Sequence, residues 1–289
     1  MEEKHNAFQW IDGNHSYIIE MNDRTGRVAP PERIILLILD KFNLKGKIAL
    51  VTGSSRGLGA GIAVALAEAG ASVAVHGSSR APEATEELLK EMGANCIGLV
   101  GDVGKADVCA RLVEDTVKHF GTIDILVNNA GTIRRSPAIE HSEEDWQTLI
   151  DVNLTSVFRL MQHAGRHMVP RGSGKIINIA SLLTFQGGIT VPSYAAAKGG
   201  VGQLTKAFAN EWAAKGVNVN AIAPGYMDTD NTEALRNNPE RARQILERIP
   251  AGRWGKPEDL AGAAVFLASS ASDYVHGHIL IVDGGWMNR

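Results

Sequence analysis

The chain has few of the residues that mark several classes of protein. Only two of its 289 residues are cysteine, Cys96 and Cys109, so a disulfide framework is excluded. The cysteines and histidines show no zinc-ligand spacing, and we expect no metal. With 29 basic and 32 acidic residues, the net charge of −3 argues against a nucleic-acid partner. No apolar run approaches the roughly 18 residues of a membrane span, and residues 34–39 are too few for a signal-peptide core. We therefore expect a cytoplasmic protein without a membrane partner.

Residues 1–43 differ from the rest of the chain. They are polar and without a clear period, yet they contain Phe8, Trp10 and Tyr17. Three interpretations stay open: a docking arm, an N-terminal hairpin, or a leader upstream of the true start. Residues 44–289 are expected to form one domain.

From Lys45 onward, short β-branched runs alternate with amphipathic helical patterns. This alternation predicts an α/β fold of the Rossmann type, a doubly wound, seven-stranded parallel sheet with helices on both faces. The expected strands are 48–51, 72–76, 95–100, 123–127, 175–179, 217–222 and 279–282. The expected helices are 60–69, 82–92, 107–120, 143–168, 194–214 and 257–267. Left-handed helix ends are expected at Gly70, Gly93, Gly121 and Gly216. Ligands should lie at the carboxyl ends of the strands.

A glycine-rich stretch, TGSSRGLG, follows the first expected strand of this domain. Glycines there permit a tight turn and let backbone N–H groups approach a pyrophosphate at the start of a helix, although such turns also serve plain packing. Two further strand ends carry small or hydrogen-bonding residues on the same edge. We therefore expect dinucleotide contacts from Gly53, Ser55, Arg56, Gly57, Leu58, Gly59, Asp102, Val103, Asn129, Ala130 and Gly131.

The end of the second strand bears on the choice of cofactor. Sites selective for NAD commonly place Asp or Glu there, whereas residues 76–80 read HGSSR. Arg56 and Arg80 can both face a 2′-phosphate, with Ser78 as a further donor. The alternative is that both arginines are merely solvated. The pattern favours NADP(H).

Tyr194 and Lys198 are four residues apart and share one face of an expected helix. Ketone reduction needs a proton donor at the carbonyl oxygen while hydride arrives from a nicotinamide. A free tyrosine has a pKa of about 10, which is too high for this role near neutrality. A lysine ammonium at ~4 Å contributes about 1 kcal/mol in water but ~4 kcal/mol at an effective dielectric constant of 20. Lys198 can therefore acidify the phenol only in a site largely closed to water.

Two further residues and two segments are candidates for the same site. Ser181 is expected to hydrogen-bond the substrate oxygen, and Asn153, at a helical position that disfavours Asn, to hold a water that relays protons to Lys198. The alternative is a surface lysine beside a packed tyrosine. Residues 224–229 read PGYMDT and are expected to pass over the nicotinamide through Pro224, Gly225, Met227 and Thr229. Residues 231–248 are charged and helical, which fits either a mobile lid or a structural excursion.

In order and spacing, these motifs resemble the short-chain dehydrogenase/reductase family from Leu44 to the C-terminus. The resemblance implies a catalytic tetrad of Asn153, Ser181, Tyr194 and Lys198. It also implies an NAD(P)(H) cofactor that Tyr194 and Lys198 contact, no metal, and a homotetramer built through the two long helices and the last strand.

Within that family, RIPAGRWG and NVNAIAPGYMDTDNT resemble the group of 2-dehydro-3-deoxy-D-gluconate 5-dehydrogenases and gluconate 5-dehydrogenases. The resemblance implies a sugar-acid substrate held by Ser181 and Tyr194. The candidate partners for its carboxylate are Arg134, Arg135 and Arg253, and for its hydroxylated carbons Gln186 and Trp254. Two features depart from the group. One is residues 1–43. The other is the end of the second strand, because the group is mostly NAD-linked whereas Arg56 and Arg80 favour NADP(H). The alternatives are a gluconate 5-dehydrogenase, a 3-oxoacyl-carrier-protein reductase and a nucleotide sensor without catalysis.

Overall fold

The computed structural model describes residues 7–12, 15–20, 32–34 and 37–289, with side chains from residue 37 onward. Its contacts divide the chain into two compact units, Met1–Phe42 and Asn43–Arg289, which are described separately. In the first unit, β1 (Ala7–Asp12), β2 (His15–Glu20) and β3 (Glu32–Ile34) form an antiparallel sheet in the order β1-β2-β3. Residues 1–6, 13–14, 21–31 and 35–36 of the expected extension lie outside the described residues.

The second unit contains a seven-stranded sheet in which every neighbouring pair is parallel. Its spatial order is β10-β9-β8-β7-β4-β5-β6, so the chain reverses direction across the sheet between β4 and β7. Each predicted strand is present with bounds within two residues, which confirms the predicted fold class. The strands are β4 (Ile48–Val51), β5 (Ser72–Gly77), β6 (Cys96–Val100), β7 (Ile125–Asn128), β8 (Gly174–Ile179), β9 (Val217–Pro224) and β10 (Ile279–Val282).

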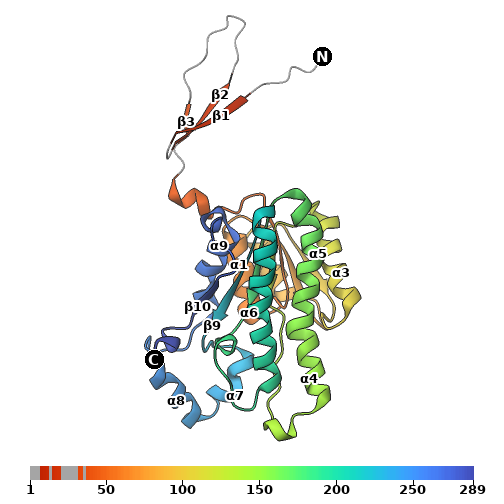
Figure 1. The fold of residues 1–289 in the computed structure, drawn as a ribbon, viewed down its shortest axis with the longest axis vertical. Coiled ribbons are helices and arrows are strands. Elements are labelled where there is room, and N and C mark those ends of the chain that lie inside the picture. The colour runs from red at the N-terminus through yellow and green to blue at the C-terminus, as the bar shows by residue number, and fades with distance from the viewer. Residues whose placement is uncertain (1–6, 13–14, 21–31, 35–36) are drawn as a thin grey trace, which may run out of the picture. The chain divides into compact units, whose positions relative to one another are not determined.

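Helices cover both faces of this sheet (Figure 1). Because side chains alternate along a strand, Leu50 of β4 packs on one face, while Ala49 and Val51 pack on the other. The face of Leu50 is covered by α3 (Ala106–Phe120), α5 (Ser156–Arg171) and α6 (Pro192–Trp212). The opposite face is covered by α1 (Gly57–Glu68), α2 (Glu83–Glu91) and α9 (Ala261–Ala268). The core therefore has two layers, and the strand ends between them stay available for a site.

The helix expected over 143–168 is not continuous. It consists of α4 (Glu143–Ile150), a π-helical turn at Asp151–Thr155, and α5. The turn contains Asn153, whose buried side chain bonds the backbone of Thr132. These tertiary bonds hold a distortion that sequence periodicity does not reveal.

The segment expected as one lid helix is also divided. It forms α7 (Glu233–Arg236) and α8 (Pro239–Arg248). The backbone N–H of Arg241 donates to the side chain of Asn238 at 3.1 Å, so Asn238 caps the new helix. Pro239 lacks the N–H needed to continue the preceding helix and suits a first helical position.

The predicted left-handed positions Gly70, Gly93, Gly121 and Gly216 all have positive φ. Within the described residues, no helix is long and apolar enough to cross a membrane.

Candidate active site

The loop between β4 and α1, residues 52–59, is here named the glycine loop. The Thr52 hydroxyl accepts the backbone N–H groups of Asn129 and Ala130, each at 3.1 Å. The Asn129 side-chain amide donates to the carbonyls of Thr52 and Gly53, each at 2.9 Å. The ends of β4 and β7 are therefore tied together at the point where the strand order reverses, as the ligand-binding rule for such sheets requires.

Two glycines make this close approach possible. Gly53 has φ +63°, and a Cβ there would lie 2.7 Å from the Ala130 Cα atom. A Cβ on Gly59 would overlap the Gly53 carbonyl oxygen and the Asn129 side-chain amide. A side chain at either position would displace the backbone of the loop.

The helix that follows presents its N-terminus to the same edge. α1 begins at Gly57, and no side chain among the described residues caps it. Its first N–H groups and its dipole suit an anion. Thr229, expected in the segment that passes over the nicotinamide, lies beside Gly57. The glycine loop therefore fits the pyrophosphate of a dinucleotide.

The residues expected at the adenosine end are placed as follows. Ser78 and Arg80 are exposed directly after β5. Asp102 is exposed after β6 and accepts the Gly104 N–H, while Val103 is buried. Arg56 is exposed and ion-paired with Asp230. Arg80 is thus the more available of the two arginines for a 2′-phosphate.

His76 received no role from the sequence, yet it is buried at the end of β5 and bonds segments on both sides. Its Nδ1 atom accepts the Gly53 N–H at 3.0 Å, and its Nε2 atom lies 2.8 Å from the Gly101 carbonyl oxygen. In the sequence, His76 is a histidine one residue before the glycine that ends β5, and this position alone indicates no role. The role becomes visible only in the fold, which places Gly53 and Gly101 at the two ring nitrogens.

The residues expected to catalyse meet at the carboxyl end of β8. Ser181 follows that strand and caps a short helical turn, with its hydroxyl accepting the Leu183 N–H at 3.2 Å. Tyr194 lies in the first turn of α6 and is hydrogen-bonded to Ser181. The Lys198 ammonium is buried 5.6 Å from the centre of the Tyr194 ring and donates to the Ile179 carbonyl at 2.6 Å.

The pKa of Tyr194 differs from the expectation of an acidic phenol. Burial raises the pKa of Tyr194, and the Ser181 hydrogen bond and the Arg135 charge lower it by less. Burial also lowers the pKa of Lys198 from 10.5 to about 8, so this ammonium is only weakly stabilised. Lys198 is not among the groups that shift this pKa here, so the acidification of the phenol by Lys198 stays a prediction. Lys198 is buried, whereas Ser181 and Tyr194 are partly exposed beside it.

Asn153 is engaged differently from the expectation. Its Oδ1 atom accepts the Thr132 N–H and its Nδ2 atom donates to the Thr132 carbonyl, each at 2.8 Å. The side-chain amide therefore tethers the segment after β7 to the π-helical turn. The water relay remains a prediction.

The buried ammonium of Lys198 predicts a pH-dependent stability. Its folded pKa of about 8 lies below 10.5, so the unfolded chain binds more protons between these values and stability rises with pH there. Because Lys198→Met removes this dependence, we expect the wild type to gain about 2 kcal/mol relative to the variant between about pH 7 and pH 9.5. Urea unfolding at both pH values measures it. Exposed Lys206→Met is the matched control, and a constant difference for Lys198→Met would contradict the prediction.

Two of the three candidate arginines are already paired. Arg253 forms a two-pronged ion pair with Asp259 at 2.6 and 2.7 Å, and this contact lowers the pKa of Asp259 to about 2. The Nε atom of Arg134 lies 3.5 Å from an Asp145 oxygen. These pairs already offset part of each charge, and the role of Arg134 and Arg253 as partners of the substrate carboxylate stays a prediction.

Arg135 is placed more favourably. Its charge acts on Tyr194, and its guanidinium lies 3.4 Å from the Asn231 carbonyl oxygen at the start of the lid segment. Among the ion pairs of the described residues, none involves Arg135. It is the one candidate cation near the reacting hydroxyl whose charge stays uncompensated.

Gln186 is held by the C-terminal segment. The indole N–H of buried Trp286 lies 3.4 Å from the Gln186 Oε1 atom, and the Arg248 guanidinium of α8 stacks 4.0 Å above the Trp286 ring. Trp254, the other expected contact, packs against Tyr226 with ring centres 5.6 Å apart. Trp254 thus belongs to an aromatic cluster that joins the lid to the segment after Ser181, and Gln186 is bonded to a member of that cluster.

The segment after β9 also lies at this edge. The Gly225 N–H donates to the Val282 carbonyl at 2.9 Å, and a Cβ on Gly225 would lie 2.6 Å from the Asp283 Cα atom. Pro224 ends β9, and Met227 is buried. This packing directs the chain across the strand ends toward Thr229.

A glycine loop with an open helix N-terminus and a Ser–Tyr–Lys cluster on one edge of a parallel sheet define a Rossmann-type oxidoreductase. Residues 53–287 match the family described as enoyl-(acyl carrier protein) reductase. The chain is 58% identical over 254 residues to a 2-dehydro-3-deoxy-D-gluconate 5-dehydrogenase of Pseudoalteromonas atlantica, a match covering 87% of this chain and 100% of that protein. The enzyme of that name from Bacillus subtilis is 55% identical, with 86% of this chain and 98% of that protein covered.

Similar solved structures point to the same family. A gluconate 5-dehydrogenase from Burkholderia cenocepacia, in complex with NADP and tartrate, has a TM-score of 0.82 and 40% identity over 88% of this chain and all of that one. A protein from Agrobacterium tumefaciens with bound NADP, provisionally named 2-deoxy-D-gluconate 3-dehydrogenase, has a TM-score of 0.81 and 54% identity over 86% of this chain and all of that one. The chain belongs to the short-chain dehydrogenase/reductase family.

Proposed function

We propose that the protein is a 2-dehydro-3-deoxy-D-gluconate 5-dehydrogenase that interconverts a secondary alcohol and a ketone with NAD(P)(H). The observation that carries this proposal is the enclosed contact of Ser181, Tyr194 and Lys198 at the edge that also holds the glycine loop. Relatives of that name at more than half identity over their whole length support the substrate.

The chain's own residues supply proton transfer and orientation. Ser181 holds the substrate oxygen. In oxidation the Tyr194 phenolate takes the proton of the substrate hydroxyl, and in reduction the Tyr194 hydroxyl donates a proton to the ketone oxygen. Lys198 stabilises the phenolate while that proton is away, and burial strengthens its effect. Bound nicotinamide supplies the matching hydride chemistry. Asn153, through Thr132, fixes the segment beside this cluster.

For the substrate carboxylate we propose Arg135 as the partner. Its charge already acts on Tyr194, so an acid held there would have its reacting carbon near the phenol. Arg135→Gln should raise the KM for the acid more than tenfold with a smaller effect on kcat. An unchanged KM would remove Arg135 from this role.

A substrate screen tests the activity. Gluconate, deoxygluconates and ketodeoxyuronates are assayed with each cofactor by the absorbance of the reduced nicotinamide. Turnover of 2-dehydro-3-deoxy-D-gluconate with the highest kcat/KM is the expected result. Preference for gluconate would favour the second candidate, gluconate 5-dehydrogenase, a name that a relative at 42% identity carries. A 3-oxoacyl thioester as best substrate would overturn both.

We propose NADP(H) as the preferred cofactor, because β5 ends without a carboxylate and Arg80 is exposed beside Ser78. Three similar structures also hold NADP. Arg80→Ala should weaken NADP(H) about tenfold while NAD(H) affinity stays unchanged, because only NADP carries the 2′-phosphate. Titration of intrinsic fluorescence measures both. Arg56→Ala should do less, since Asp230 already shares that charge. Equal losses for the two cofactors would refute the assignment.

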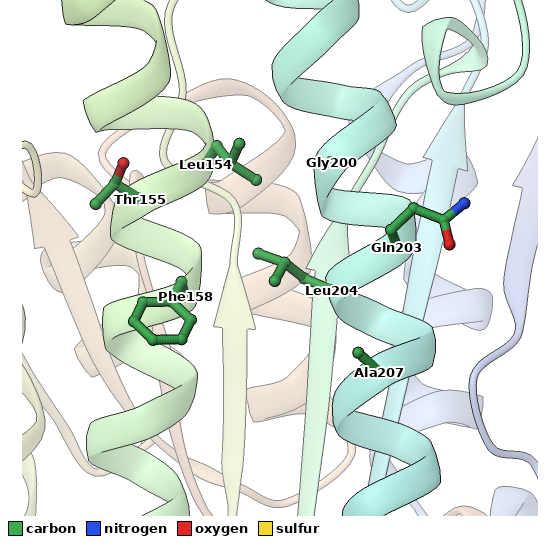
Figure 2. A pocket seen from close by; sticks show the side chains of 7 residues that line it. All are labelled: Leu154, Thr155, Phe158, Gly200, Gln203, Leu204 and Ala207. Carbon is green, nitrogen blue, oxygen red and sulfur yellow. The ribbon is translucent and has the colours of Figure 1, made fainter.

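We propose a homotetramer whose contacts include the outer faces of α5 and α6. Figure 2 shows the residues that line an apolar pocket along these helices: Leu154, Thr155 and Phe158 on one side, and Gly200, Gln203, Leu204 and Ala207 of α6 on the other. Phe158 is 39% exposed, which is unusual for so large an apolar ring. Sedimentation equilibrium tests the proposal, and a monomer at micromolar concentration would refute it.

We also propose a cytoplasmic location. The free thiols of Cys96 and Cys109 fit a reducing compartment. Cell fractionation tests this, and recovery outside the cytoplasm would refute it.

For residues 1–43 we propose an appendage that the dehydrogenase unit does not require. The division of contacts at Phe42 supports this. Removal of the residues before Phe42 should leave kcat/KM within about twofold of the value for the full chain. The thermal midpoint should change by no more than a few degrees. Insoluble or dissociated protein would show that the segment is structural.

A further inference from the structure

His76 forms a bridge that the proposed catalytic steps do not use. It lies on β5, between β4 and β6 in the sheet, with 1% of its surface exposed. Through its ring it bonds Gly53 in the glycine loop and Gly101 in the segment after β6. One side chain therefore connects the pyrophosphate loop to the segment that carries Asp102 and Val103.

The partners of the ring define one protonation state. The Gly53 N–H is a donor, so the Nδ1 atom at 3.0 Å must carry a lone pair. The Gly101 carbonyl is an acceptor, so the Nε2 atom at 2.8 Å must carry the proton. A charged imidazolium also carries a proton on Nδ1. That N–H would face the Gly53 N–H, and the hydrogen bond between them would be lost.

The backbone around the ring holds it in this position. The His76 N–H donates to the Ser54 hydroxyl at 2.8 Å, and the Ser54 N–H donates to the His76 carbonyl at 2.9 Å. The Thr52–Gly53 peptide is also fixed on its other side, because the Thr52 carbonyl accepts the Asn129 side-chain amide at 2.9 Å, as does the Gly53 carbonyl. His76 and Asn129 thus determine the orientation of Gly53 from opposite ends.

The surroundings of the ring favour the neutral form. Burial lowers the pKa of His76, the Gly101 hydrogen bond partly opposes this, and Arg111 on α3 lowers the pKa further. Asp102, after β6, raises it. Arg111 itself donates to the Val100 carbonyl at 2.9 Å, so its charge is fixed close to the end of β6.

We propose that His76 is a positioning residue for the cofactor, which as a neutral imidazole protonated on Nε2 holds the Gly53 peptide in its binding orientation and couples it to residues 101–103. The proposal rests on the proposed use of a dinucleotide. It predicts that cofactor affinity does not depend on the charge of this ring above the usual pKa of a histidine, about 6.5, and falls as His76 becomes charged at lower pH.

Three variants separate the two hydrogen bonds. His76→Phe removes both and should raise the Kd for NADP about tenfold or more, with kcat at saturating cofactor within about twofold. His76→Asn keeps an acceptor near the position of Nδ1 and should recover most of the affinity. His76→Gln keeps a donor near Nε2 only and should resemble His76→Phe. Calorimetric titration with NADP gives these values without turnover.

Nitrogen NMR of the wild-type protein tests the proposal where a variant fails to fold. At neutral pH the His76 ring should show a proton on Nε2 and none on Nδ1, and it should titrate below the usual pKa of a histidine. A proton on Nδ1, or a charged ring at neutral pH, would overturn the proposal.

The outcomes also separate this proposal from the proposed function. Unchanged Kd values in His76→Phe would overturn the positioning role while the substrate screen still stood. Loss of thermal stability with unchanged Kd would show a merely structural role and would likewise overturn it. NADP binding that depends on His76, in a protein without dehydrogenase activity, would support His76 and refute the enzyme assignment.

Discussion

Tyr194→Phe is expected to lower kcat by about 10³-fold while the Kd for the cofactor stays unchanged, because a positioned general acid contributes on this scale. The substitution removes only the hydroxyl, so the ring that lies 5.6 Å from the Lys198 ammonium is retained. Stopped-flow single turnovers with saturating cofactor measure the chemical step apart from product release.

The matched control is Tyr274→Phe. Tyr274 is fully exposed, so loss of its hydroxyl should leave kcat and stability unchanged. Ser181→Ala should cost less than Tyr194→Phe, since the proton donor remains and only its alignment is lost. Retention of more than a tenth of the activity in Tyr194→Phe would refute the proton-transfer role.

The raised pKa of Tyr194 adds a pH signature to this series. Because burial favours the neutral phenol, oxidation, which needs the base form, should speed up with rising pH, and reduction should not. The Arg135 charge lowers this pKa, so Arg135→Gln should move the rise in the oxidation rate to higher pH. A profile unaffected by Arg135 would separate that residue from the phenol.

The fold could be predicted from sequence because its signals are local. Buried parallel strands such as Ile48–Val51 are continuous apolar runs, and the glycines that end α1 and α3 stand where the pattern stops. The π-helical turn at Asp151–Thr155 could not be predicted, since Asn153 and the backbone of Thr132 are far apart in the chain. The division of the lid at Pro239 carried a local signal that the predicted continuous helix disregarded.

The site divides along the same line. Residue types in sequence order placed Ser181, Tyr194 and Lys198, and the structure brings them together. The sequence does not reveal which group each charged side chain pairs with. The pairing of Arg253 with Asp259 joins residues six apart in the chain, a spacing that neither a helical nor a strand period marks. The bridge through His76 depends on the tertiary order β4-β5-β6.

The tight packing of the glycine loop leads to the second large effect. Gly59→Ala should weaken cofactor binding about a hundredfold, because its Cβ would overlap the Gly53 carbonyl oxygen and the Asn129 amide. The first group is backbone, and the second belongs to a side chain that makes two hydrogen bonds, so neither can move without a cost in free energy. We expect about 1–3 kcal/mol of destabilisation from such overpacking. Calorimetry and urea unfolding measure the two effects separately.

Gly262→Ala supplies a control of the same chemistry with the opposite sign. Gly262 is exposed in α9, and no described atom lies within 4 Å of the position its Cβ would take. Alanine is the better helix former by about 0.5–1 kcal/mol, so this variant should be more stable than the wild type and bind cofactor normally. If Gly59→Ala behaved like Gly262→Ala, the glycine loop would have room for a side chain, and its close approach to Asn129 could not be what shapes the pyrophosphate site.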